Sequence, residues 1–496
     1  MEKRKRDMEC SLLEWSYAGE LVSLGYVSGD RLCPRHCVDI HDLEVLELAS
    51  LLAKRRLSPA ELLAHTLARI ERVNPRLNAY LSFSPRAARD AAAAERRRAQ
   101  RKSVHPLCGI PISIKDLILS RDSLTTAGSR CFGDGLASDH DAPVVAHLRR
   151  LGAVIVGRVN LHEIALGVTS VNEHFGPARN PWNLDHVAGG SSGGSAVAVA
   201  AGLGAASVGT DTRGSIRIPA ACCGVVGLKP TRGLVSTRHV VPLSPTLDNV
   251  GPLARSVADA AIMLGAMTGG GAREVAWMRA TRRRASRLRV GVSEYHLRDL
   301  DDEVQRAIEH AMQVMRRMGV RFHDVRIPGV DDVQAASVVI TASEAIAFHD
   351  AIVRERPESY GPLVRQRLEG GYNWRAVDYL HAQDTRRRFE RDVRAAFDSV
   401  DVLLGATLPA LPPRIGDHSV RINGTEAHTV DSFTRLNSPQ NMAGLPAMSL
   451  PVGFSQSGLP LGLQLMAGHH GESALFTLGA AYQRETDWHR RRPVVG

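Results

Sequence analysis

The chain has 496 residues, a formal net charge of +10 and a sequence pI of about 9.5. Apolar residues make up 44% and charged residues 23%, close to globular averages, which excludes a disordered or a fibrous chain. No run approaches the roughly 18 uncharged apolar residues of a membrane span, and the basic N-terminus lacks a signal-peptide core. We therefore expect a cytoplasmic protein with no membrane contact.

After an N-terminal extension, the predicted elements alternate between helices and strands. Residues 1–40 show no clear period, and disorder is one expectation for them. A capping box with proline at the first helical position opens a helix at Ser58 that runs to about Val73. Further helices are predicted at 42–55, 87–100, 142–151, 302–318, 333–353, 375–397 and 472–484, and strands at 109–114, 154–156, 288–292, 320–325, 402–404, 447–451 and 462–465. This alternation predicts one large α/β domain, residues 41–496, around a largely buried sheet.

The positive charge is distributed along the chain in short arginine runs, at 96–98, 282–284, 386–388 and 490–492. Most runs have acidic residues nearby, and aromatic residues make up only 5% of the chain. A nucleic-acid binder would gather its cations on one element and add aromatic rings for stacking. The pattern therefore predicts solvated faces and no nucleic-acid partner.

The seven cysteines are expected to be reduced thiols, because the chain is long and shows no export signal. Cys33 and Cys37, with His36 and His41, give only a faint zinc pattern, since no second ligand pair follows at zinc-finger spacing. We expect no metal and no cofactor.

Two segments rich in glycine and serine, at 189–202 and 209–219, stand out. A P-loop needs a lysine after its glycines, and a Rossmann fingerprint needs a preceding strand; neither is present. The stretch 190–194 matches G-x-S-x-G, but a polar turn replaces the strand of a nucleophile elbow. A glycine-rich turn that lets helix and sheet approach closely is the structural alternative.

A lysine upstream supplies the base that a serine nucleophile needs. An ordinary lysine has a pKa near 10.4, so only about one in 2,500 is neutral at pH 7. Burial disfavours the charged form and can lower this pKa by several units. Lys115 follows the apolar run Ile110–Ile114, which suits burial, although the adjacent Asp116 could instead neutralise it. The residues thus favour a Ser–Ser–Lys arrangement.

From about residue 41 to its end, the sequence resembles the amidase signature family of serine hydrolases. The resemblance rests on several long motifs in the family's order: 109–116, 189–202, 211–231, 241–255, 441–447 and 458–465. It implies a twisted mixed sheet sandwiched between helices. It also implies a general base at Lys115, a bridging serine on a cis peptide at Ser191 that relays the proton, and a nucleophile at Ser215. The implied oxyanion hole consists of the backbone N–H groups of Thr212, Arg213, Gly214 and Ser215.

One residue departs from the family pattern, because Arg213 stands where the family usually has glycine. The favoured interpretation is a side chain aimed away from the pocket; otherwise it narrows the pocket or binds an acidic group of the substrate. Ser192 is expected to be structural, and Asp211 and Arg217 are expected to hold the loop.

The resemblance implies hydrolysis of a carboxylic amide through a Ser215 acyl-enzyme. Aryl amides, esters and carbamates are further substrates for the same residues. We expect a small-molecule amide substrate and, by the resemblance alone, a homodimer. The alternatives are a subunit of a tRNA-dependent amidotransferase, which works only in a complex, and an inactive homologue.

Overall fold

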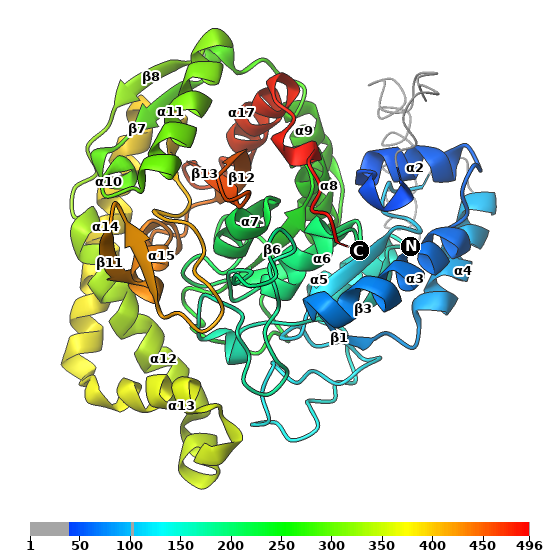
Figure 1. Ribbon diagram of the computed structural model, residues 1–496, viewed down its shortest axis with the longest axis horizontal. Helices are drawn as coiled ribbons and strands as arrows, with labels where there is room; N and C mark the ends of the chain where they lie inside the picture. Colours follow the sequence, from blue (N-terminus) through cyan, green and yellow to red (C-terminus); the bar gives the residue numbers. More distant parts are fainter. Residues whose placement is uncertain (1–38, 101–103, 496) are drawn as a thin grey trace, which may run out of the picture.

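The centre of the protein is an 11-stranded mixed sheet with the strand order β1-β3-β2-β4-β6-β5-β12-β13-β9-β7-β8 (Figure 1). The computed structural model describes residues 39–100 and 104–495. The strands of the sheet are β1 (Tyr80–Phe83), β2 (Pro111–Lys115), β3 (Val154–Val159), β4 (Ala206–Asp211), β5 (Val226–Lys229), β6 (Asn249–Ala254), β7 (Arg289–Val292), β8 (Arg321–Asp324), β9 (Val402–Ala406), β12 (Ala447–Phe454) and β13 (Pro460–Met466). A separate hairpin joins β10 (Ser419–Ile422) to β11 (Thr425–His428). This architecture confirms the predicted fold class.

Helices cover both faces of the sheet. One face carries α5 (Pro143–Arg150), α8 (Val257–Met267), α9 (Ala272–Ala280), α11 (Asp302–Arg317) and α17 (Glu472–Glu485), which share the larger apolar core. The other carries α3 (Pro59–Leu77), α4 (Ala87–Gln100), α6 (Gly193–Ala200) and α7 (Arg217–Cys223), which share a second core. The remaining α-helices are α2 (Val45–Ala53), α10 (Glu294–Leu297), α12 (Val333–Glu355), α13 (Pro362–Glu369), α14 (Ala376–Ser399), α15 (Thr429–Arg435) and α16 (Ser438–Met442).

The strand pairing brings the candidate residues to one edge of the sheet. β2 pairs in parallel with both β3 and β4, so the carboxyl ends of all three strands lie at the same edge. Lys115 is the last residue of β2, and Asp211 is the last residue of β4. The loop that follows β4 continues to Ser215, and β6 fixes it from the other side by pairing Asn249 with Asp211.

The predicted helix that opens at Ser58 begins as expected. Ser58 accepts a hydrogen bond from the N–H of Glu61, and the Glu61 carboxylate accepts one from the N–H of Ser58. The helix runs four residues beyond the prediction, to Leu77, and ends at Asn78 in the left-handed conformation (φ 52°). The boundary at residue 40 stays a prediction, and the faint zinc pattern at Cys33 to Cys37 lies outside the described residues.

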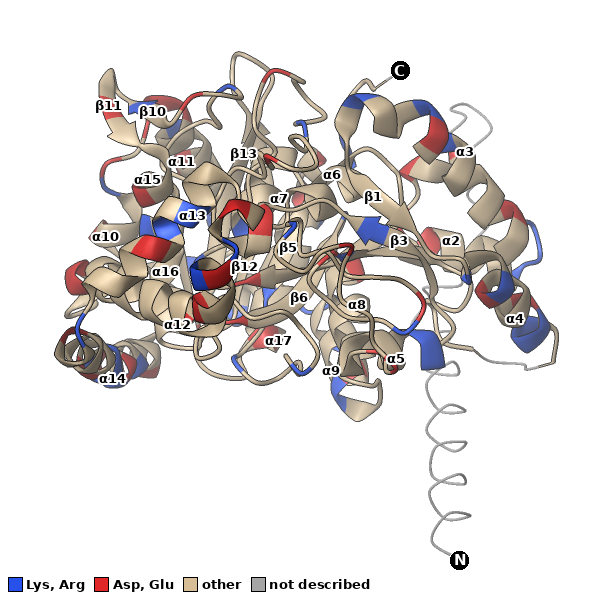
Figure 2. Cartoon of the chain, turned by 90° about the horizontal axis from the view of Figure 1, so that it is seen from below, with Lys and Arg blue, Asp and Glu red and all other residues tan. Residues whose placement is uncertain are grey.

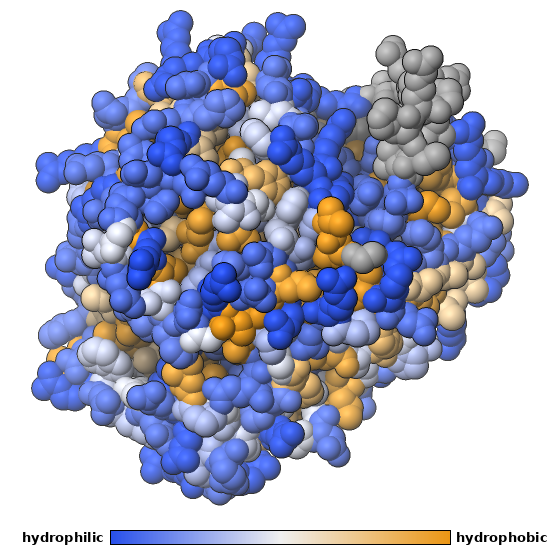
Figure 3. Space-filling view, viewed as in Figure 1, coloured by the Kyte–Doolittle hydropathy of each residue, from blue (hydrophilic) through white to orange (hydrophobic). Residues whose placement is uncertain are grey.

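One helical segment, Val330–Glu355, is long and apolar enough to cross a membrane, with a mean hydropathy of 1.4. This differs from the expectation that no run approaches a span. Half of its apolar window is buried inside the protein, as in the core helix of a globular domain, and α12 packs against α14. In the views shown, charges of both signs lie side by side along the described chain (Figure 2), and apolar side chains show between hydrophilic ones (Figure 3).

Candidate active site

Lys115 lies fully buried at the end of β2 and contacts two hydroxyl groups. Its Nζ lies 2.7 Å from Ser191 Oγ and 2.8 Å from Thr210 Oγ1. Burial lowers the pKa of Lys115 to about 7, against the opposing effect of the carboxylates of Asp248 and Asp211. At that pKa a large fraction of the amine is neutral near pH 7, and its lone pair can accept a proton.

The carboxylate next to Lys115 in sequence does not neutralise it. Asp116 is also buried, but its carboxylate accepts hydrogen bonds from Thr126 and lies 3.4 Å from Nη1 of the buried Arg158. Among the described residues, no carboxylate lies within ion-pair distance of Lys115. The alternative of a lysine neutralised by its neighbour therefore does not hold in this structure.

The first glycine and serine segment places Ser191 against Lys115. The Gly190–Ser191 peptide bond is cis, as the resemblance implied, and α6 begins two residues later, at Gly193. Only glycine fits at position 194, because a Cβ atom there would lie 2.4 Å from the carbonyl oxygen of Asn160. The backbone at Gly194 thus lies close to Asn160, as expected of a glycine-rich turn, and this packing holds the segment that carries Ser191.

Ser192 points away from Lys115. Its hydroxyl donates to the carbonyl of Thr210 at 3.0 Å and accepts from the N–H of Thr210 at 3.2 Å, and its N–H donates to the carbonyl of Ser215. These contacts link the two glycine and serine segments and support a structural role.

A buried ion pair shapes the loop that carries Ser215. Asp211 accepts hydrogen bonds from the N–H groups of Gly214 (2.8 Å) and Ile216 (3.1 Å), and it pairs with the fully buried Arg217 at 3.0 Å. The Arg217 guanidinium helps to lower the pKa of Asp211 to about 2, despite its burial. Four further acceptors, on Gln440, Gln464, Asn437 and Asn441, satisfy Arg217.

Of the four backbone N–H groups predicted to form an oxyanion hole, one is already occupied. The N–H of Gly214 donates to Asp211 and is therefore not available to an oxyanion. Within the described chain, the N–H groups of Thr212, Arg213 and Ser215 have no acceptor. Three of the four expected donors are thus free to bind an oxyanion.

Ser215 lies at the wall of a cavity of about 270 Å³. The residue is 6% exposed, and in the described structure its hydroxyl forms no hydrogen bond with Ser191 or any other group. The structure thus brings Lys115 and Ser191 together, and the carbonyl of Ser215 accepts a hydrogen bond from the N–H of Ser192, the residue after Ser191, at 3.1 Å. Catalytic hydrogen bonds are often open without substrate and close when it binds.

Two residues near Lys115 were missed by the sequence reasoning. Thr210 provides the second hydroxyl on the lysine, and the buried Asp248 accepts hydrogen bonds from Thr212 and from the N–H groups of Leu243 and Ser244. Burial raises the pKa of Asp248 to about 6. Thr210 could have been noticed in the sequence, because it directly precedes Asp211, a residue that the sequence analysis did single out.

Arg213 lines the cavity together with Ser215, contrary to the favoured expectation of a side chain aimed away from it. Its Nε lies 3.3 Å from Ser438 Oγ, and its Nη2 lies 3.0 Å from Thr434 Oγ1. By contrast, Cys222 and Cys223 are fully buried behind the loop, as expected for packing residues.

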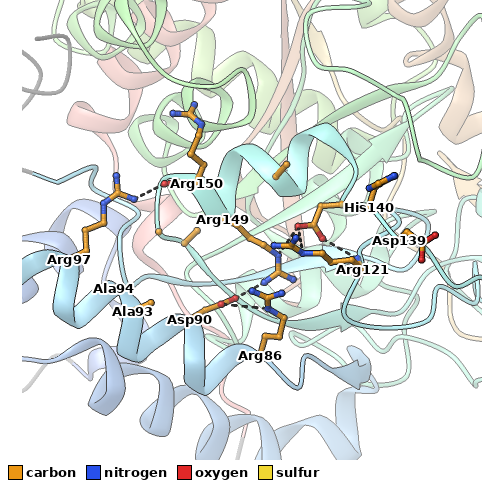
Figure 4. A pocket seen from close by; sticks show the side chains of 14 residues that line it. Arg86, Asp90, Ala93, Ala94, Arg97, Arg121, Asp139, His140, Arg149 and Arg150 are labelled. Carbon is orange, nitrogen blue, oxygen red and sulfur yellow. Dashed lines mark hydrogen bonds and ion pairs between the residues drawn. The ribbon is translucent and has the colours of Figure 1, made fainter. Parts of the chain in front are cut away.

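A larger hollow, of about 570 Å³, lies away from this site between α4 and α5 (Figure 4). Several of its charged groups pair with one another: Arg149 with Asp90, Asp122 and Asp141, and Arg121 with Asp141. No serine, cysteine or lysine is among the residues that line it, so it lacks the residue types of the arrangement described above.

A family model described as Amidase matches residues 61–476. This chain belongs to the amidase signature family. A curated relative, a glutamyl-tRNA(Gln) amidotransferase subunit from Geotalea daltonii, is 36% identical over 92% of this chain and 100% of its own length. Two solved structures are similar. One is an inhibitor-bound vestigial protein complex described as revealing the evolutionary origins of an s-triazine catabolic enzyme (33% identity, 89% coverage of this chain and 98% of the other, TM-score 0.85). The other is 6-aminohexanoate cyclic dimer hydrolase with its substrate (28% identity, 92% and 100% coverage, TM-score 0.82).

These relatives establish an enzyme of this family and correct one expectation. The exclusion of a nucleic-acid partner was wrong, because the relatives include several subunits of a tRNA-dependent amidotransferase. The scattered arginines and the few aromatic rings bear only on whether this chain binds RNA directly. An enzyme that works in a complex can meet RNA through other subunits, and composition does not record this.

Proposed function

We propose that this protein hydrolyses linear carboxylic amide bonds through an acyl-enzyme on Ser215. The observation that carries the proposal is the buried Lys115, whose Nζ lies 2.7 Å from Ser191 Oγ without a carboxylate partner, beside the cavity that Ser215 lines. A buried amine that contacts only hydroxyl groups is suited to accept a proton from them.

The first chemical step forms the acyl-enzyme. With substrate bound, the hydroxyls of Ser191 and Ser215 come within hydrogen-bond distance. Ser215 Oγ attacks the carbonyl carbon, its proton passes to Ser191, and the Ser191 proton passes to Lys115. The negative charge on the carbonyl oxygen is stabilised by the free N–H groups of Thr212, Arg213 and Ser215, each worth about 3 to 4 kcal/mol where such donors have been measured.

The second half of the cycle returns the proton. The Lys115 ammonium protonates the departing nitrogen through Ser191, the C–N bond breaks, and the amine leaves. Water then enters, loses a proton along the same route and attacks the acyl carbon. Cleavage of the ester bond to Ser215 releases the acid and restores the neutral lysine. Aryl amides, esters and carbamates fit the same steps.

The test is amine release from a panel of alkyl amides, an anilide, an ester, an aryl carbamate and L-glutamine. We expect Ser215→Ala to reduce kcat by about four orders of magnitude, because the nucleophile is lost while folding is retained. The matched control is Ser457→Ala, which removes an exposed hydroxyl far from the cavity lining. Turnover in Ser215→Ala equal to that of the wild type would overturn the proposal.

A second candidate is the amide-donating subunit of an amidotransferase. It is favoured by the relatives of that name, which this chain matches over 98–100% of their length. The discriminating result is ammonia release from glutamine that starts only when glutamyl-tRNA(Gln) and partner subunits are added. Turnover of simple amides by the isolated chain supports hydrolysis instead.

We also propose that the enzyme acts in the cytoplasm, with residues 41–496 as the catalytic domain. The support for the location is chemical: Cys108, Cys131, Cys222 and Cys223 are buried free thiols, as is usual in a reducing compartment.

A further inference from the structure

The Arg213 side chain lines the cavity and forms no ion pair within the described residues. Two hydroxyls, of Ser438 and Thr434, hold its Nε and Nη2. Nη1 has no hydrogen-bond partner in the described part of the chain, and no described carboxylate lies within ion-pair distance. A guanidinium carries five N–H donors, so several of them stay available to a ligand.

The rest of the cavity adds a second such cation. Arg367, on α13, also lines it and donates to the carbonyl of Leu166, and it too lacks an ion pair within the described residues. The acid that lines the cavity, Asp431, is 69% exposed and contacts His428 at 3.2 Å. Most other lining side chains are small or apolar, among them Leu166, Val168, Leu243 and Val338.

The contrast with Arg217 shows that this arrangement is unusual within the same loop. Arg217 is fully buried, but Asp211 neutralises it and four further acceptors satisfy it. Charge that is withdrawn from water without a counter-ion is unfavourable. Burial lowers the pKa of Arg213 only to about 10, so the group keeps its charge at neutral pH. The carboxylate of Asp431 attracts it from the exposed rim of the cavity but forms no ion pair with it.

We propose that Arg213 binds a carboxylate of the substrate, so that the enzyme selects amides with an anionic group close to the scissile carbonyl. This inference rests on the proposed amide hydrolysis at Ser215. The planar guanidinium fork matches a carboxylate with two parallel hydrogen bonds. Arg213 is two residues from Ser215 in the same cavity wall, so the anionic group and the reacting carbonyl belong to one short substrate.

The test compares acids with neutral amides of the same shape. Oxamate, malonamate and succinamate are each paired with their diamide, oxamide, malonamide and succinamide, and ammonia release gives kcat/KM for every compound. We expect the wild type to favour the acid of at least one pair by about 10- to 100-fold, the range of a hydrogen bond between charged groups. The spacing of the preferred pair measures the distance from the carbonyl to Arg213.

Variants assign this preference to Arg213. Arg213→Gln is expected to reduce the acid-to-diamide ratio by at least tenfold, mainly through KM, and Arg213→Lys is expected to restore part of it. Arg365→Gln is the matched control, because Arg365 lies on α13 near Arg367 but does not line the cavity and is paired with Glu369 at 2.7 Å. It should leave the ratio unchanged.

The outcomes separate the two proposals. Cleavage of diamides and acids with equal kcat/KM, or a ratio that Arg213→Gln leaves unchanged, overturns the role of Arg213 and leaves the hydrolase standing. If no amide is cleaved and a sulfonyl fluoride fails to label Ser215 in the folded protein, the proposed hydrolysis fails, and the substrate class falls with it. The labelling rate in Arg213→Gln shows whether that variant keeps an intact loop.

Discussion

Two buried lysines occupy similar places in the sheet and have different surroundings. Lys115 ends β2 and Lys229 ends β5, both are fully buried, and burial lowers the pKa of each to about 7. The Nζ of Lys115 contacts the hydroxyls of Ser191 and Thr210. The Nζ of Lys229 donates to the carbonyl of Pro230 at 2.8 Å, and no described hydroxyl lies within hydrogen-bond distance of it.

The comparison shows that a lowered pKa does not by itself identify a catalytic base. Burial produces the same shift wherever a lysine leaves water. A carbonyl oxygen has no proton to give, so Lys229 has nothing to accept from its partner. Lys115 differs because its two contacts are hydroxyls, which can exchange a proton with it. The hydroxyl contacts, rather than the pKa, distinguish the two lysines.

For the two lysines, the largest expected difference is in kcat after each is replaced in turn. Lys115→Met should reduce kcat by about a thousandfold or more, because the proton acceptor is lost while the apolar volume is kept. Lys229→Met should leave kcat within about tenfold of the wild type. Steady-state kinetics on the preferred amide, with the folded state checked by circular dichroism, make the measurement. Equal losses in the two variants would contradict the assignment of the proton path to Lys115 alone.

The pH dependence of kcat/KM should also distinguish the two lysines. Only neutral Lys115 accepts a proton, so kcat/KM should rise with pH through about 7 and then level off. Lys229→Met should leave this profile in place. The profile is measured with a substrate that does not titrate in that range.

Stability should respond equally to both lysines. Each has a folded pKa of about 7, below its unfolded value of 10.5, so the unfolded chain binds more protons between these limits. Each lysine therefore makes the free energy of unfolding rise with pH between about 7 and 10.5. Below pH 7 the lysine is protonated in both states and no longer contributes to this slope. Urea titrations of either Met variant should show a smaller slope. A change in only one variant would mean that the two burial environments differ.

The sequence indicated candidate residues that lie in continuous motifs, but it did not indicate the contacts contributed by distant segments. Lys115, Ser191 and Ser215 lie in continuous motifs, and the helix at Ser58 is specified by its own cap. Thr210 was missed because its contact with Lys115 depends on the pairing of β2 with β4, whose glycine-containing sequence, Ala206–Asp211, has no clear strand period.

The direction of the Arg213 side chain could not be predicted for a related reason. Its partners Thr434 and Ser438 lie 221 and 225 residues further along the chain, on or next to α15 and α16. The favoured expectation was based on the loop sequence alone, which does not record these distant partners. The packing of α15 and α16 against the loop provides hydroxyls that hold the guanidinium beside the cavity.

The smallest expected effect is at Ser192, the neighbour of the bridging serine. Both of its hydroxyl contacts are with the backbone of Thr210, and neither is with Lys115. Ser192→Ala leaves the buried N–H and C=O of Thr210 without these partners, so we expect a loss of about 1 to 3 kcal/mol in the free energy of unfolding. Thr210 also contacts Lys115, so the loss of Ser192 should lower kcat indirectly, by less than about tenfold. Ser191→Ala should lose nearly all activity, because Ser191 contacts Lys115 directly. Urea denaturation and kinetics on both variants separate the two serines, and a Ser192→Ala enzyme as inactive as Ser191→Ala would place Ser192 in the proton path instead.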